Sequence, residues 1–469
     1  MKNNHIITIP YITGDWIWQD LMPHSQAVLQ AAWQKEYWKW SKIVYKELLA
    51  WQEAFLKTWN WLPQETIDIL KRYAMKLKWP TATLNDRSVN VALRYEEDLY
   101  ANIRTSNYID WVPSPLIAPW RKNNQVTFRE TVEDVYVDPW FYANQESTKQ
   151  LIHILNTQFG YSLDEIDTAI GIKPISKKKS ERLIRSGAEW AKKYGCNLLT
   201  LVHKWNIQKA TEWYFKNLWY QLIQNEYGDD FITQKQRWAL ENHLAKKSLE
   251  ENAFSIDRDR FPILNEQQRR DAINEVKAII EKYGSTNWED KKVVNDIIAD
   301  NALQQATLNH DKFEVIVTTN LNWDYLSDAL AAWVWWLWFM WWANHNPETM
   351  MTIAEPAHWT WPDLERNIAN PISMLESIAI TLTLHWYDEV AYRIRKGYQD
   401  QILTRRVTKD LCNTANKNYT RVLKQKKASP DTLGIDLLLQ YTKLINDSYT
   451  PLWTQQFAEE IIQKVHLQK

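Results

Sequence analysis

Glycine is scarce in this sequence. Only nine of the 469 residues are glycine, whereas an average usage of about 7% would give roughly 33. Tryptophan is abundant instead, with 29 residues. The two counts together are close to an ordinary glycine count with a few tryptophans added. The sequence therefore looks as if many of its glycines have been written as tryptophan.

Cysteine is rare, the charges are balanced, and no signal peptide is expected. Cys196 and Cys412 stand alone, so a disulfide framework and a zinc signature are excluded, and a reducing compartment such as the cytoplasm is expected. Lysine and arginine total 56, and aspartate and glutamate total 57. This balance argues against a nucleic-acid partner. The start, MKNNHIITIP, has no apolar core of a signal peptide.

No uncharged run is long enough to span a membrane. The longest, Ala329 to Ala343, has fifteen residues, whereas a spanning helix needs about 20. Within it lies AAWVWWLWFMWWAN (331–344), in which six of fourteen residues are tryptophan. A buried helix of this composition is equally disfavoured, because each indole N–H needs a hydrogen-bond partner. The segment therefore needs another explanation.

Short apolar strands alternate with amphipathic helices along much of the chain. The segments IITIPYI (6–12) and FEVIVTTN (313–320) are predicted as strands, and helices are predicted over about 21–33, over 65–78 and from Asp324. This alternation is typical of an α/β fold. Residues 125–138 and 165–176 alternate at period two around a helix at 147–159, which indicates a separate, partly antiparallel part. Residues 226–295 are charge-rich and mainly helical, as an insertion would be.

Five motifs together resemble bacterial isocitrate dehydrogenase, of the isocitrate/isopropylmalate dehydrogenase family. The chain has IPYITGDWIW for the family's IPYIEGDGIG, RSVNVALR for RSLNVALR, and LVHKWN for LVHKGN. It has NLNWDYLSDALAA for NLNGDYISDALAA, and HWTWP for HGTAP. The resemblance runs over about 10–465. It implies an α/β, isopropylmalate dehydrogenase-like two-domain fold with a central mixed sheet, a smaller α/β domain and a dimer clasp. The large domain would comprise 1–99 and 335–469, the small domain 100–133 and 177–334, and the clasp 134–176.

The same resemblance explains the tryptophans. At least twelve stand where the family has glycine: Trp16, Trp18, Trp79, Trp205, Trp213, Trp219, Trp323, Trp335, Trp336, Trp338, Trp342 and Trp359. Glycine is used where φ is positive or two backbones approach closely, and tryptophan is nearly the worst replacement. Some bacteria read UGA as glycine, while another code table reads it as tryptophan. We therefore hypothesise that a gene of the first kind was translated with the second table.

Three aspartates are candidates for a metal site. Asp324 and Asp328 lie four residues apart at the start of a helix and so share a face. Taken alone, the pair fits a helix cap and a solvated charge. The resemblance implies instead that they bind Mg²⁺ or Mn²⁺, which prefer oxygen ligands. It also implies that Asp300 reaches the metal of the neighbouring subunit.

The remaining site residues also come from the matched motifs. The resemblance implies that isocitrate, a tricarboxylate, is bound by arginine forks. Its ligands would be Ser88, Asn90, Arg94, Arg104 and Arg129. Tyr136 and Lys204 would transfer protons. Lys204 would act across the interface of a homodimer with shared active sites. A lone arginine, lysine or tyrosine would carry no such role.

The cofactor segment departs from the family pattern. The resemblance places the nicotinamide cofactor against Glu355, His358 and Asn370, without a GxGxxG loop. NADP-using members have Lys-Tyr after the motif's proline, whereas this chain has Asp363 and then leucine. A carboxylate there repels a 2′-phosphate and can accept bonds from a ribose diol. This favours NAD, although the 226–295 insertion resembles one found in some NADP-using enzymes.

Two alternatives stay open at the level of sequence. Within the enzyme class, the chain could be a homoisocitrate or 3-isopropylmalate dehydrogenase. In another class, it could be an inactive tryptophan-rich binding protein on a decayed dehydrogenase scaffold. No membrane partner is expected for the enzyme.

Overall fold

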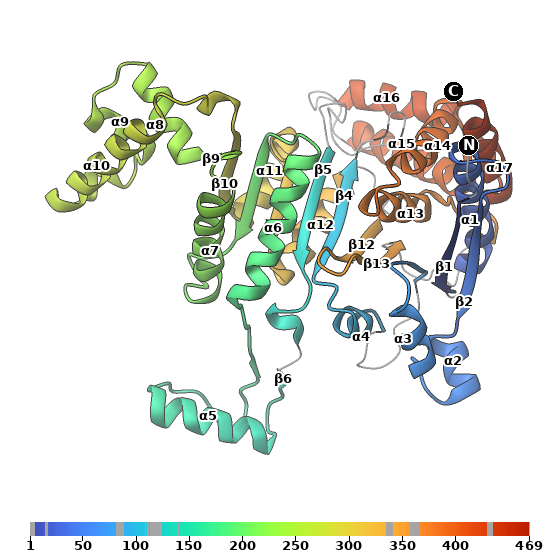
Figure 1. The fold of residues 1–469 in the computed structure, drawn as a ribbon, viewed down its shortest axis with the longest axis horizontal. Helices are drawn as coiled ribbons and strands as arrows, with labels where there is room; N and C mark the ends of the chain where they lie inside the picture. The colour runs from blue at the N-terminus through green and yellow to red at the C-terminus, as the bar shows by residue number, and fades with distance from the viewer. Residues whose placement is uncertain are drawn as a thin grey trace. The chain divides into compact units, whose positions relative to one another are not determined.

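The fold is known from a computed structural model (Figure 1). It describes residues 5–14, 17–80, 89–107, 109, 112, 124–137, 140–333, 341–356, 366–428 and 435–468. The chain forms two compact units. Unit 1 comprises Met1–Val132, Gln305–Asp311 and Trp323–Lys469, and unit 2 comprises Glu133–Gln304 and Lys312–Asn322. The five-segment domain division expected from the resemblance stays a prediction.

Unit 1 is built on a mixed sheet with the strand order β2-β1-β3-β13-β12-β4-β5. The first four strands are parallel, and β12, β4 and β5 continue the sheet with antiparallel pairing. The strands are β1 (Ile6–Ile12), β2 (Lys42–Leu48), β3 (Met75–Lys78), β4 (Ala101–Asn107), β5 (Asn124–Glu130), β12 (Trp341–Asn346) and β13 (Met351–Pro356). This sheet carries the arginines discussed below.

Helices complete unit 1. They are α1 (Ile17–Glu36), α2 (Trp51–Thr58), α3 (Gln64–Leu70), α4 (Val89–Glu96), most of α12 (Asn320–Trp333), α13 (Ile372–Leu384), α14 (Asp388–Leu403), α15 (Lys409–Ala428), α16 (Ile435–Ser448) and α17 (Thr454–Leu467). A short parallel pair, β14 (Arg406–Thr408) and β15 (Thr450–Leu452), joins them. The core buries apolar residues of α1, α13, α14 and α17 against β1 and β3. Helix α13 is buried along almost its whole length, so hydrophobic burial is the main stabilising term here.

Unit 2 has a parallel sheet of order β11-β8-β10-β9. Its strands are β8 (Leu198–His203), β9 (Phe231–Thr233), β10 (Lys292–Ile298) and β11 (Val315–Thr318). Its helices are α6 (Lys177–Lys193), α7 (Thr211–Glu226), α8 (Gln234–Leu244), α9 (Leu249–Ile256), α10 (Glu266–Tyr283) and most of α11 (Ala299–Leu308). Single turns of 3₁₀ helix lie at Asp134–Val137, Phe261–Ile263 and Trp288–Asp290, and a further one, His310–Lys312, lies mostly in unit 1. The strands β8 and β11 are fully or nearly fully buried, as parallel strands between helices are.

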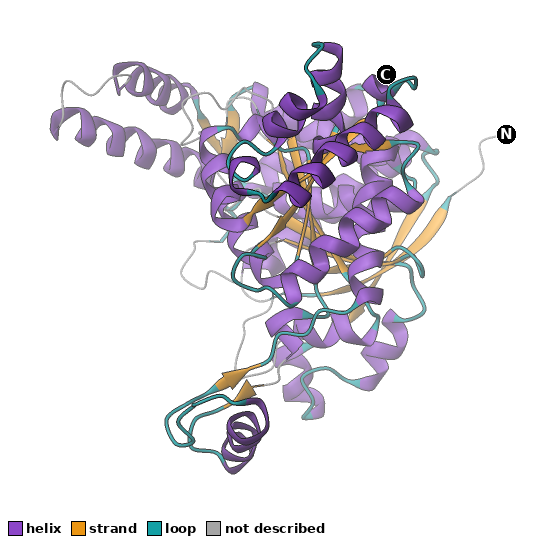
Figure 2. Cartoon of the chain, turned by 90° about the vertical axis from the view of Figure 1, so that its left-hand side faces the viewer, coloured by secondary structure: helices purple, strands orange, loops and turns teal. Residues whose placement is uncertain are grey.

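Two parts of unit 2 extend from its sheet. Strands β6 (Trp140–Phe141) and β7 (Ile170–Gly171) form an antiparallel pair that carries α5 (Glu146–Phe159), at the lower left of Figure 2. We call residues 140–171 the arm. Helices α8, α9 and α10 pack around their own small apolar core, which includes Leu240, Phe261 and Tyr283. These helices occupy the segment that the sequence indicated as a helical insertion.

The α/β class, the strand at 6–12 and the helix at 147–159 are confirmed, and the strand predicted over 313–320 is present as the shorter β11, since Asn320 already begins α12. The continuous helix expected over 65–78 is wrong, because α3 ends at Leu70 and residues 75–78 form the strand β3. The side chains of Lys76 and Lys78 are buried there, and each is ion-paired, with Glu97 and Glu355 respectively. Because both lysines are ion-paired, the strand can bury them. The helical spacing of the apolar residues therefore does not determine the structure of this segment. Among the helices of the described ranges, none combines the length and the apolar character needed to cross a bilayer.

Two buried histidines make the stability of unit 1 depend on pH. Thr352 Oγ1 lies 2.8 Å from His345 Nδ1 and 2.9 Å from His385 Nε2. Burial, reinforced by the other histidine, lowers the pKa of His345 to about 3. Burial, reinforced by Lys76, lowers the pKa of His385 to about 4. Both side chains are therefore neutral in the folded protein at pH 5, whereas they are protonated in the unfolded chain.

We expect unfolding to become easier as the pH falls from about 7 towards 4. The unfolded state then binds protons that the folded state excludes, which at pH 5 lowers the free energy of unfolding by roughly 2 kcal/mol for each histidine. Urea unfolding at pH 7 and pH 5 measures this difference. A variant with both His345→Asn and His385→Asn should lose most of the pH dependence, and the exposed control His243→Asn should keep it. An unchanged difference in the double variant would contradict this assignment.

Candidate active site

Two arginines lie on one face of the unit 1 sheet. In the antiparallel pair of β4 and β5, Arg129 is opposite Asn102, and Arg104 is opposite Thr127. Residues two apart on a strand point to the same face, so Arg104, Arg129 and Thr127 share one. Both arginine side chains are buried. Burial of two like charges is tolerated only when anions lie beside them.

The anions are the two aspartates predicted as metal ligands. Arg104 donates to Asp328 Oδ1 at 2.9 Å and to Ser327 Oγ at 3.0 Å, and Arg129 Nη1 lies 3.1 Å from Asp324 Oδ1. The one-turn spacing of Asp324 and Asp328 on α12 matches the spacing of the arginines on the sheet. Burial lowers the pKa of Arg104 to about 10, although the interaction with Asp328 acts to raise that pKa. The structure thus brings together two predicted substrate ligands and two predicted metal ligands.

A tryptophan fills the volume between the two arginines. The guanidinium carbons of Arg104 and Arg129 lie 4.3 and 4.5 Å from the centre of the Trp323 ring. The Trp342 ring lies 5.0 Å from Arg104 on the same face. Trp323 is buried, and its indole N–H donates to Thr127 Oγ1 at 3.0 Å. Both tryptophans are among the twelve that stand for family glycines, so glycine would leave this volume open.

Lys204 and Asp300 form an ion pair in unit 2. Lys204 follows β8, and its Nζ lies 2.5 Å from Asp300 Oδ1 in the first turn of α11. This hydrogen bond from Lys204 holds the pKa of Asp300 below its ordinary value. Asp300 is largely exposed. An exposed carboxylate beside an amine can exchange its partner for a cation, which is compatible with the predicted role.

Tyr136 lies on a short 3₁₀ turn, Asp134–Val137, that opens unit 2. The turn begins at the buried Asp134, whose φ is 70°. Asp134 accepts hydrogen bonds from the backbone N–H of Val135 at 2.7 Å and of Leu321 at 2.9 Å. A carboxylate that bonds nearby backbone groups can stabilise this left-handed conformation. The turn that carries Tyr136 is thereby fixed to the first turn of α12.

The predicted cofactor residues are only partly described. Glu355, on β13, accepts from Lys78 Nζ at 2.8 Å and from the Trp342 indole at 3.3 Å. Asn370 is buried before α13, where its Nδ2 donates to Asp410 Oδ2 at 3.1 Å and its Oδ1 accepts from the Ile372 amide at 3.0 Å. Its side chain is thus engaged in capping α13. His358 and Asp363 lie outside the described residues.

Arg94, Asn90 and Ser88 are the remaining predicted substrate ligands. Arg94 is buried on α4. Asn90 is on the same helix, but its side chain lies outside what the structure describes, and so does Ser88 as a whole. Their roles as substrate ligands stay predictions.

Within one chain, Asp324 and Asp328 provide only part of the carboxylate ligands that a hydrated divalent cation would need. Asp324 and Asp328 side chains are 48% and 72% exposed, and their oxygens are hard ligands of the kind that Mg²⁺ and Mn²⁺ prefer. Within the described ranges, no group of three or more His, Cys, Asp or Glu side chains is placed to hold a metal. A third carboxylate from a neighbouring subunit, as predicted for Asp300, would complete such a site.

Sequence reasoning missed the buried charges behind Lys204. Glu212, in the first turn of α7, is fully buried and accepts four hydrogen bonds, one of them from the Lys204 backbone. Lys173 bridges Glu212 and Asp134, at 2.5 and 3.1 Å. No local pattern distinguishes these residues from solvated charges, because their partners are distant in sequence. The proximity of Glu212 to the LVHKWN motif is the one sequence signal.

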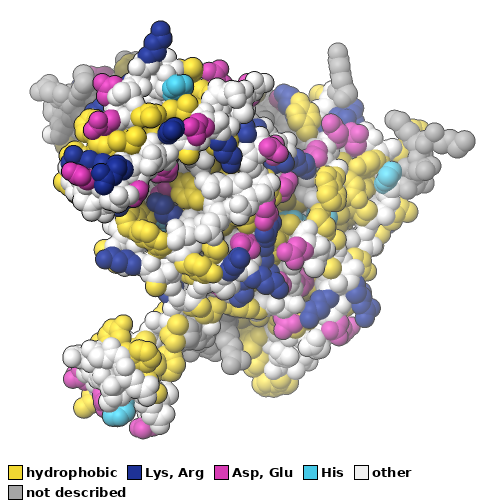
Figure 3. All heavy atoms as spheres, turned by 60° about the vertical axis from the view of Figure 1, so that its left-hand side comes forward, with side chains coloured by type: hydrophobic (Ala, Val, Ile, Leu, Met, Phe, Trp, Pro, Cys, Tyr) yellow, Lys and Arg dark blue, Asp and Glu magenta, His cyan; other side chains and the backbone are white. Residues whose placement is uncertain are grey.

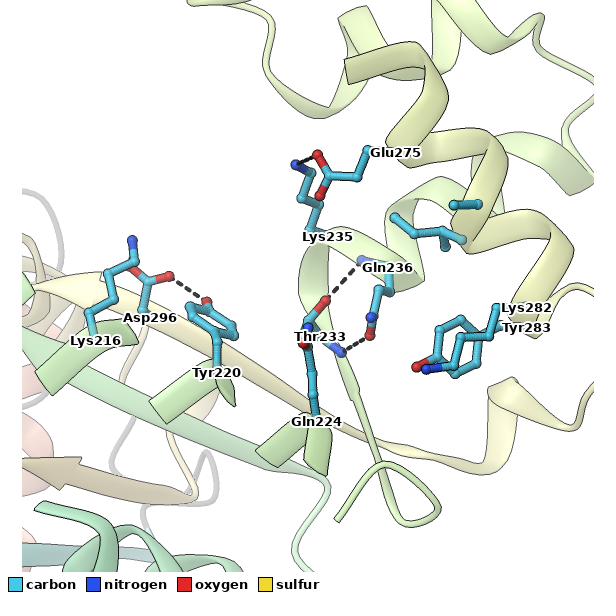
Figure 4. Close-up of a pocket in the computed structure, with 12 residues that line it drawn as sticks. Lys216, Tyr220, Gln224, Thr233, Lys235, Gln236, Glu275, Lys282, Tyr283 and Asp296 are labelled. Carbon is cyan, nitrogen blue, oxygen red and sulfur yellow. Dashed lines mark hydrogen bonds and ion pairs between the residues drawn. The ribbon is translucent and has the colours of Figure 1, made fainter. Parts of the chain in front are cut away.

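A cavity of about 530 Å³ lies elsewhere in unit 2, between α7, α8, α10 and β10 (Figure 4). Burial opposes ionisation of Asp296 in its wall. Hydrogen bonds from His203, Lys216 and Tyr220 outweigh that effect and hold the pKa of Asp296 well below its ordinary value. Lys235 is likewise paired with Glu275, at 2.5 Å. None of the predicted site residues lines this cavity.

Comparison with known proteins agrees with the motifs. The family model for isocitrate/isopropylmalate dehydrogenase matches residues 8–426. Isocitrate dehydrogenase [NADP] of Staphylococcus aureus (strain MSSA476) is 36% identical over 408 residues, covering 86% of this chain and 89% of the relative. Isocitrate dehydrogenase [NADP] of Nostoc sp. (strain PCC 7120) is 35% identical over 426 residues, with the same coverage.

The fold agrees as well. The crystal structure of isocitrate dehydrogenase from Methylococcus capsulatus is similar with a TM-score of 0.64 and 23% identity, and the match covers 98% of this chain and 99% of that one. The resemblance inferred from the five motifs is therefore confirmed. The chain belongs to the isocitrate/isopropylmalate dehydrogenase family.

Proposed function

We propose that this protein is an isocitrate dehydrogenase, which converts isocitrate to 2-oxoglutarate and CO₂ while reducing a nicotinamide cofactor. The observation that carries the proposal is the pairing of Arg104 and Arg129 with Asp328 and Asp324 on one face of the sheet. These pairs place carboxylate-binding and cation-binding groups beside each other. The relatives named isocitrate dehydrogenase support the same reaction.

The arginines bind the substrate's carboxylates. A guanidinium offers parallel N–H donors that match a carboxylate and hold it in one orientation. Arg104 and Arg129 are buried, so their charges are weakly screened and act strongly on an anion. Arg94, with Ser88 and Asn90, would contact the remaining polar groups. Together they would hold the substrate in one orientation.

Lys204 and Tyr136 transfer protons. Lys204 takes the C2 hydroxyl proton, directly or through water, as the substrate is oxidised. Asp324, Asp328 and Asp300 of the partner subunit would hold a divalent cation, which would supply Lewis-acid polarisation, and a bound nicotinamide would supply the hydride acceptor. After CO₂ leaves, Tyr136 donates a proton to C3 of the enolate. Both residues belong to unit 2, where hydrogen-bonded carboxylates hold the segments that carry them.

The proposed coenzyme is NADP. The lean towards NAD, which rests on Asp363, is not supported by the relatives, whose names specify NADP. Glu355 is already ion-paired with Lys78, and Asn370 is engaged in capping α13. We propose that Glu355, His358, Asp363 and Asn370 hold the coenzyme, and that Glu355 and Asn370 also support the segments that carry them.

The arm supports a homodimer with shared active sites. It exposes many large apolar side chains, which appear as yellow patches on the lobe at the lower left of Figure 3: Trp140, Tyr142, Ile154, Phe159, Tyr161 and Ile166. An exposed apolar surface of this kind marks an interaction site. If Asp300 completes the carboxylate set of a second chain, as the resemblance implies, the dimer would be needed for activity.

The proposal is tested by a coenzyme-reduction assay on the purified dimer with Mg²⁺ or Mn²⁺. We expect turnover with isocitrate and a higher kcat/KM with NADP than with NAD. Homoisocitrate and 3-isopropylmalate serve as control substrates and should give less than about one hundredth of that rate, because unmatched polar groups discriminate strongly. Preference for either control substrate would overturn the assignment of substrate.

A further inference from the structure

We propose that Glu212 is a positioning residue that fixes Lys204 relative to the Tyr136 turn. This inference rests on the proposed function, because it concerns the residues that move protons there. Glu212 begins α7, eight residues after Lys204, and its carboxylate is fully buried. A buried carboxylate is stable only when its lone pairs are satisfied.

Each oxygen of Glu212 accepts two hydrogen bonds. Oε1 accepts from Lys173 Nζ at 2.5 Å and from Thr319 Oγ1 at 2.9 Å. Oε2 accepts from the Lys204 amide at 2.9 Å and from Asn322 Nδ2 at 2.9 Å. These four donors come from three segments of unit 2, around Lys173, around Lys204 and at the start of α12. The carboxylate therefore determines how these segments lie relative to one another.

The hydrogen-bond partners of Glu212 lie next to the proposed proton-transfer residues and metal ligands. Binding the Lys204 amide fixes the loop from which its side chain reaches Asp300. Asn322 lies in the first turn of α12, the helix that continues to Asp324 and Asp328. Lys173 also contacts Asp134, which begins the turn carrying Tyr136. One carboxylate thus links the backbone of the proposed base with the turn of the proposed acid.

Glu212→Gln is the direct test, because glutamine keeps the shape but has one acceptor oxygen and places an N–H₂ group against two donors. We expect kcat with isocitrate to fall about 10- to 100-fold, as misplacement of a catalytic group does, while KM changes less than about threefold. Glu376→Gln is the matched control. Glu376 is a buried carboxylate of α13 that accepts from Tyr398 and, at 3.2 Å, from Arg395. Its replacement should lower the melting temperature without lowering kcat.

Hydrogen exchange tests the same role without turnover. The peptides containing Lys204 and Leu321 should exchange faster in Glu212→Gln than in the parent, and should be unchanged in Glu376→Gln. A kcat within twofold of the parent, or unchanged exchange at Lys204, would overturn the positioning role. If the parent does not oxidise isocitrate, the proposed function fails, and exchange alone decides whether Glu212 holds Lys204.

A second, independent observation concerns the backbone. From it we infer that Trp51, Trp59 and Trp386 are glycine in the natural polypeptide. Ten non-glycine residues of the described chain have positive φ, and three are these tryptophans. Four others are Asn or Asp, the types that tolerate this region. None of the three is among the twelve tryptophans matched to family glycines, so this inference comes from backbone geometry alone.

Trp386 ends α13 in the way that a glycine of this chain ends α6. After α13, the Tyr387 amide donates to Leu382 O at 2.8 Å and the Trp386 amide donates to Thr383 O at 3.3 Å. After α6, the Cys196 amide donates to Ala191 O at 3.0 Å and the Gly195 amide to Lys192 O at 3.4 Å. These are the two bonds of the Schellman motif, in which the left-handed residue is usually glycine. The φ values agree, at 61° for Trp386 and 67° for Gly195.

The other two positions repeat the pattern. Trp59 ends α2 with a φ of 57°, and its amide donates to Phe55 O at 2.9 Å, as in the left-handed cap with a single bond. Trp51 begins α2 with a φ of 65°. It is buried, and its indole N–H has no hydrogen-bond partner among the described residues. Tryptophan is unfavourable at a position where the backbone is left-handed and the buried indole N–H has no hydrogen-bond partner.

Mass and stability test this inference. In protein purified from its own cells, peptides covering residues 51, 59 and 386 should each be lighter by the difference between tryptophan and glycine, and the gene should carry UGA there. In the chain made with tryptophan, Trp386→Gly and Trp59→Gly should each raise the melting temperature by about 1–2 °C, because relief of a left-handed side chain gives roughly 1 kcal/mol. Trp40→Gly is the control, since Trp40 is 64% exposed, like Trp59 at 82% and Trp386 at 69%, but is not among the residues with positive φ. It should not stabilise. Native peptides with the mass of tryptophan, or UGG codons, would overturn the inference.

Discussion

A chain made with glycine at the twelve matched positions should oxidise isocitrate at least 100-fold faster than the chain made with tryptophan there. The reason lies between Arg104 and Arg129. A carboxylate bound by both must bring oxygens to about 2.7–2.9 Å from their nitrogens, and the indole of Trp323 occupies that volume. Displacement of a bound substrate by about 1 Å already costs roughly 100-fold in rate.

The two forms should also differ in stability, because other matched tryptophans are buried. The indole N–H groups of Trp79 and Trp219 are buried without hydrogen-bond partners among the described residues. Each such group costs about 1–3 kcal/mol, so the glycine form should also be the more stable of the two. Initial rates with isocitrate and thermal melting of both forms measure these differences.

Two single variants separate the causes. Trp323→Gly alone should restore part of the activity, because it opens the arginine pair. Trp33→Gly should instead destabilise the fold, since Trp33 is buried in the core and its indole donates to His5 O at 3.0 Å. Loss of such a core tryptophan costs about 3–5 kcal/mol. Equal activity of the two twelve-position forms would contradict the prediction and favour true tryptophans throughout.

The same comparison decides between the two classes of function. A tryptophan-rich binding protein would keep its properties only in the tryptophan form, and it would have no need for the ion pairs of α12 with β4 and β5. Those pairs persist around Trp323. A decayed scaffold has no selection to retain four charged residues in this arrangement. The geometry therefore favours the enzyme.

Elements with strong local patterns could be predicted from the sequence. The strand β1 and the helix α5 lie where their periodicity indicated. Strand β3 could not be predicted, because its lysines are stabilised by Glu97 and Glu355, which lie far along the chain. A local pattern carries no information about such partners. The helical spacing of the apolar residues over 65–78 therefore predicts a helix that includes Met-Lys-Leu-Lys.

The candidate site shows the same limit. Motifs identified Arg104 and Arg129, and the register of β4 with β5 then explains why they share a face. Apart from the nearness of Glu212 to the LVHKWN motif, no sequence pattern distinguishes Glu212 and Asp134, since a buried acid and a solvated acid look alike in a sequence. Their importance depends on donors such as Lys173, Thr319 and Asn322, which only the fold brings to them.

Arg104→Met should raise the KM for isocitrate by about 30- to 4000-fold. Removing one partner of a buried charge pair costs about 2–5 kcal/mol, and every 1.4 kcal/mol corresponds to tenfold in affinity. Burial lowers the pKa of Arg104 to about 10, which leaves it protonated at pH 7 but poorly solvated. Its partner Asp328 is mostly exposed and neutralises the buried charge of Arg104 only in part. A substrate carboxylate that pairs with Arg104 therefore binds strongly.

The comparison variants are Arg104→Lys and Arg395→Met. Lysine keeps the charge without the planar fork, so its KM should lie between those of the parent and the methionine variant. Arg395 is paired with the buried Glu376 at 3.2 Å and belongs to none of the predicted sites, so its loss should lower the melting temperature and leave KM unchanged. Steady-state kinetics and isocitrate titration calorimetry give both quantities. A KM within threefold of the parent in Arg104→Met would show that the pair on β4 and α12 stabilises the fold and does not bind the substrate.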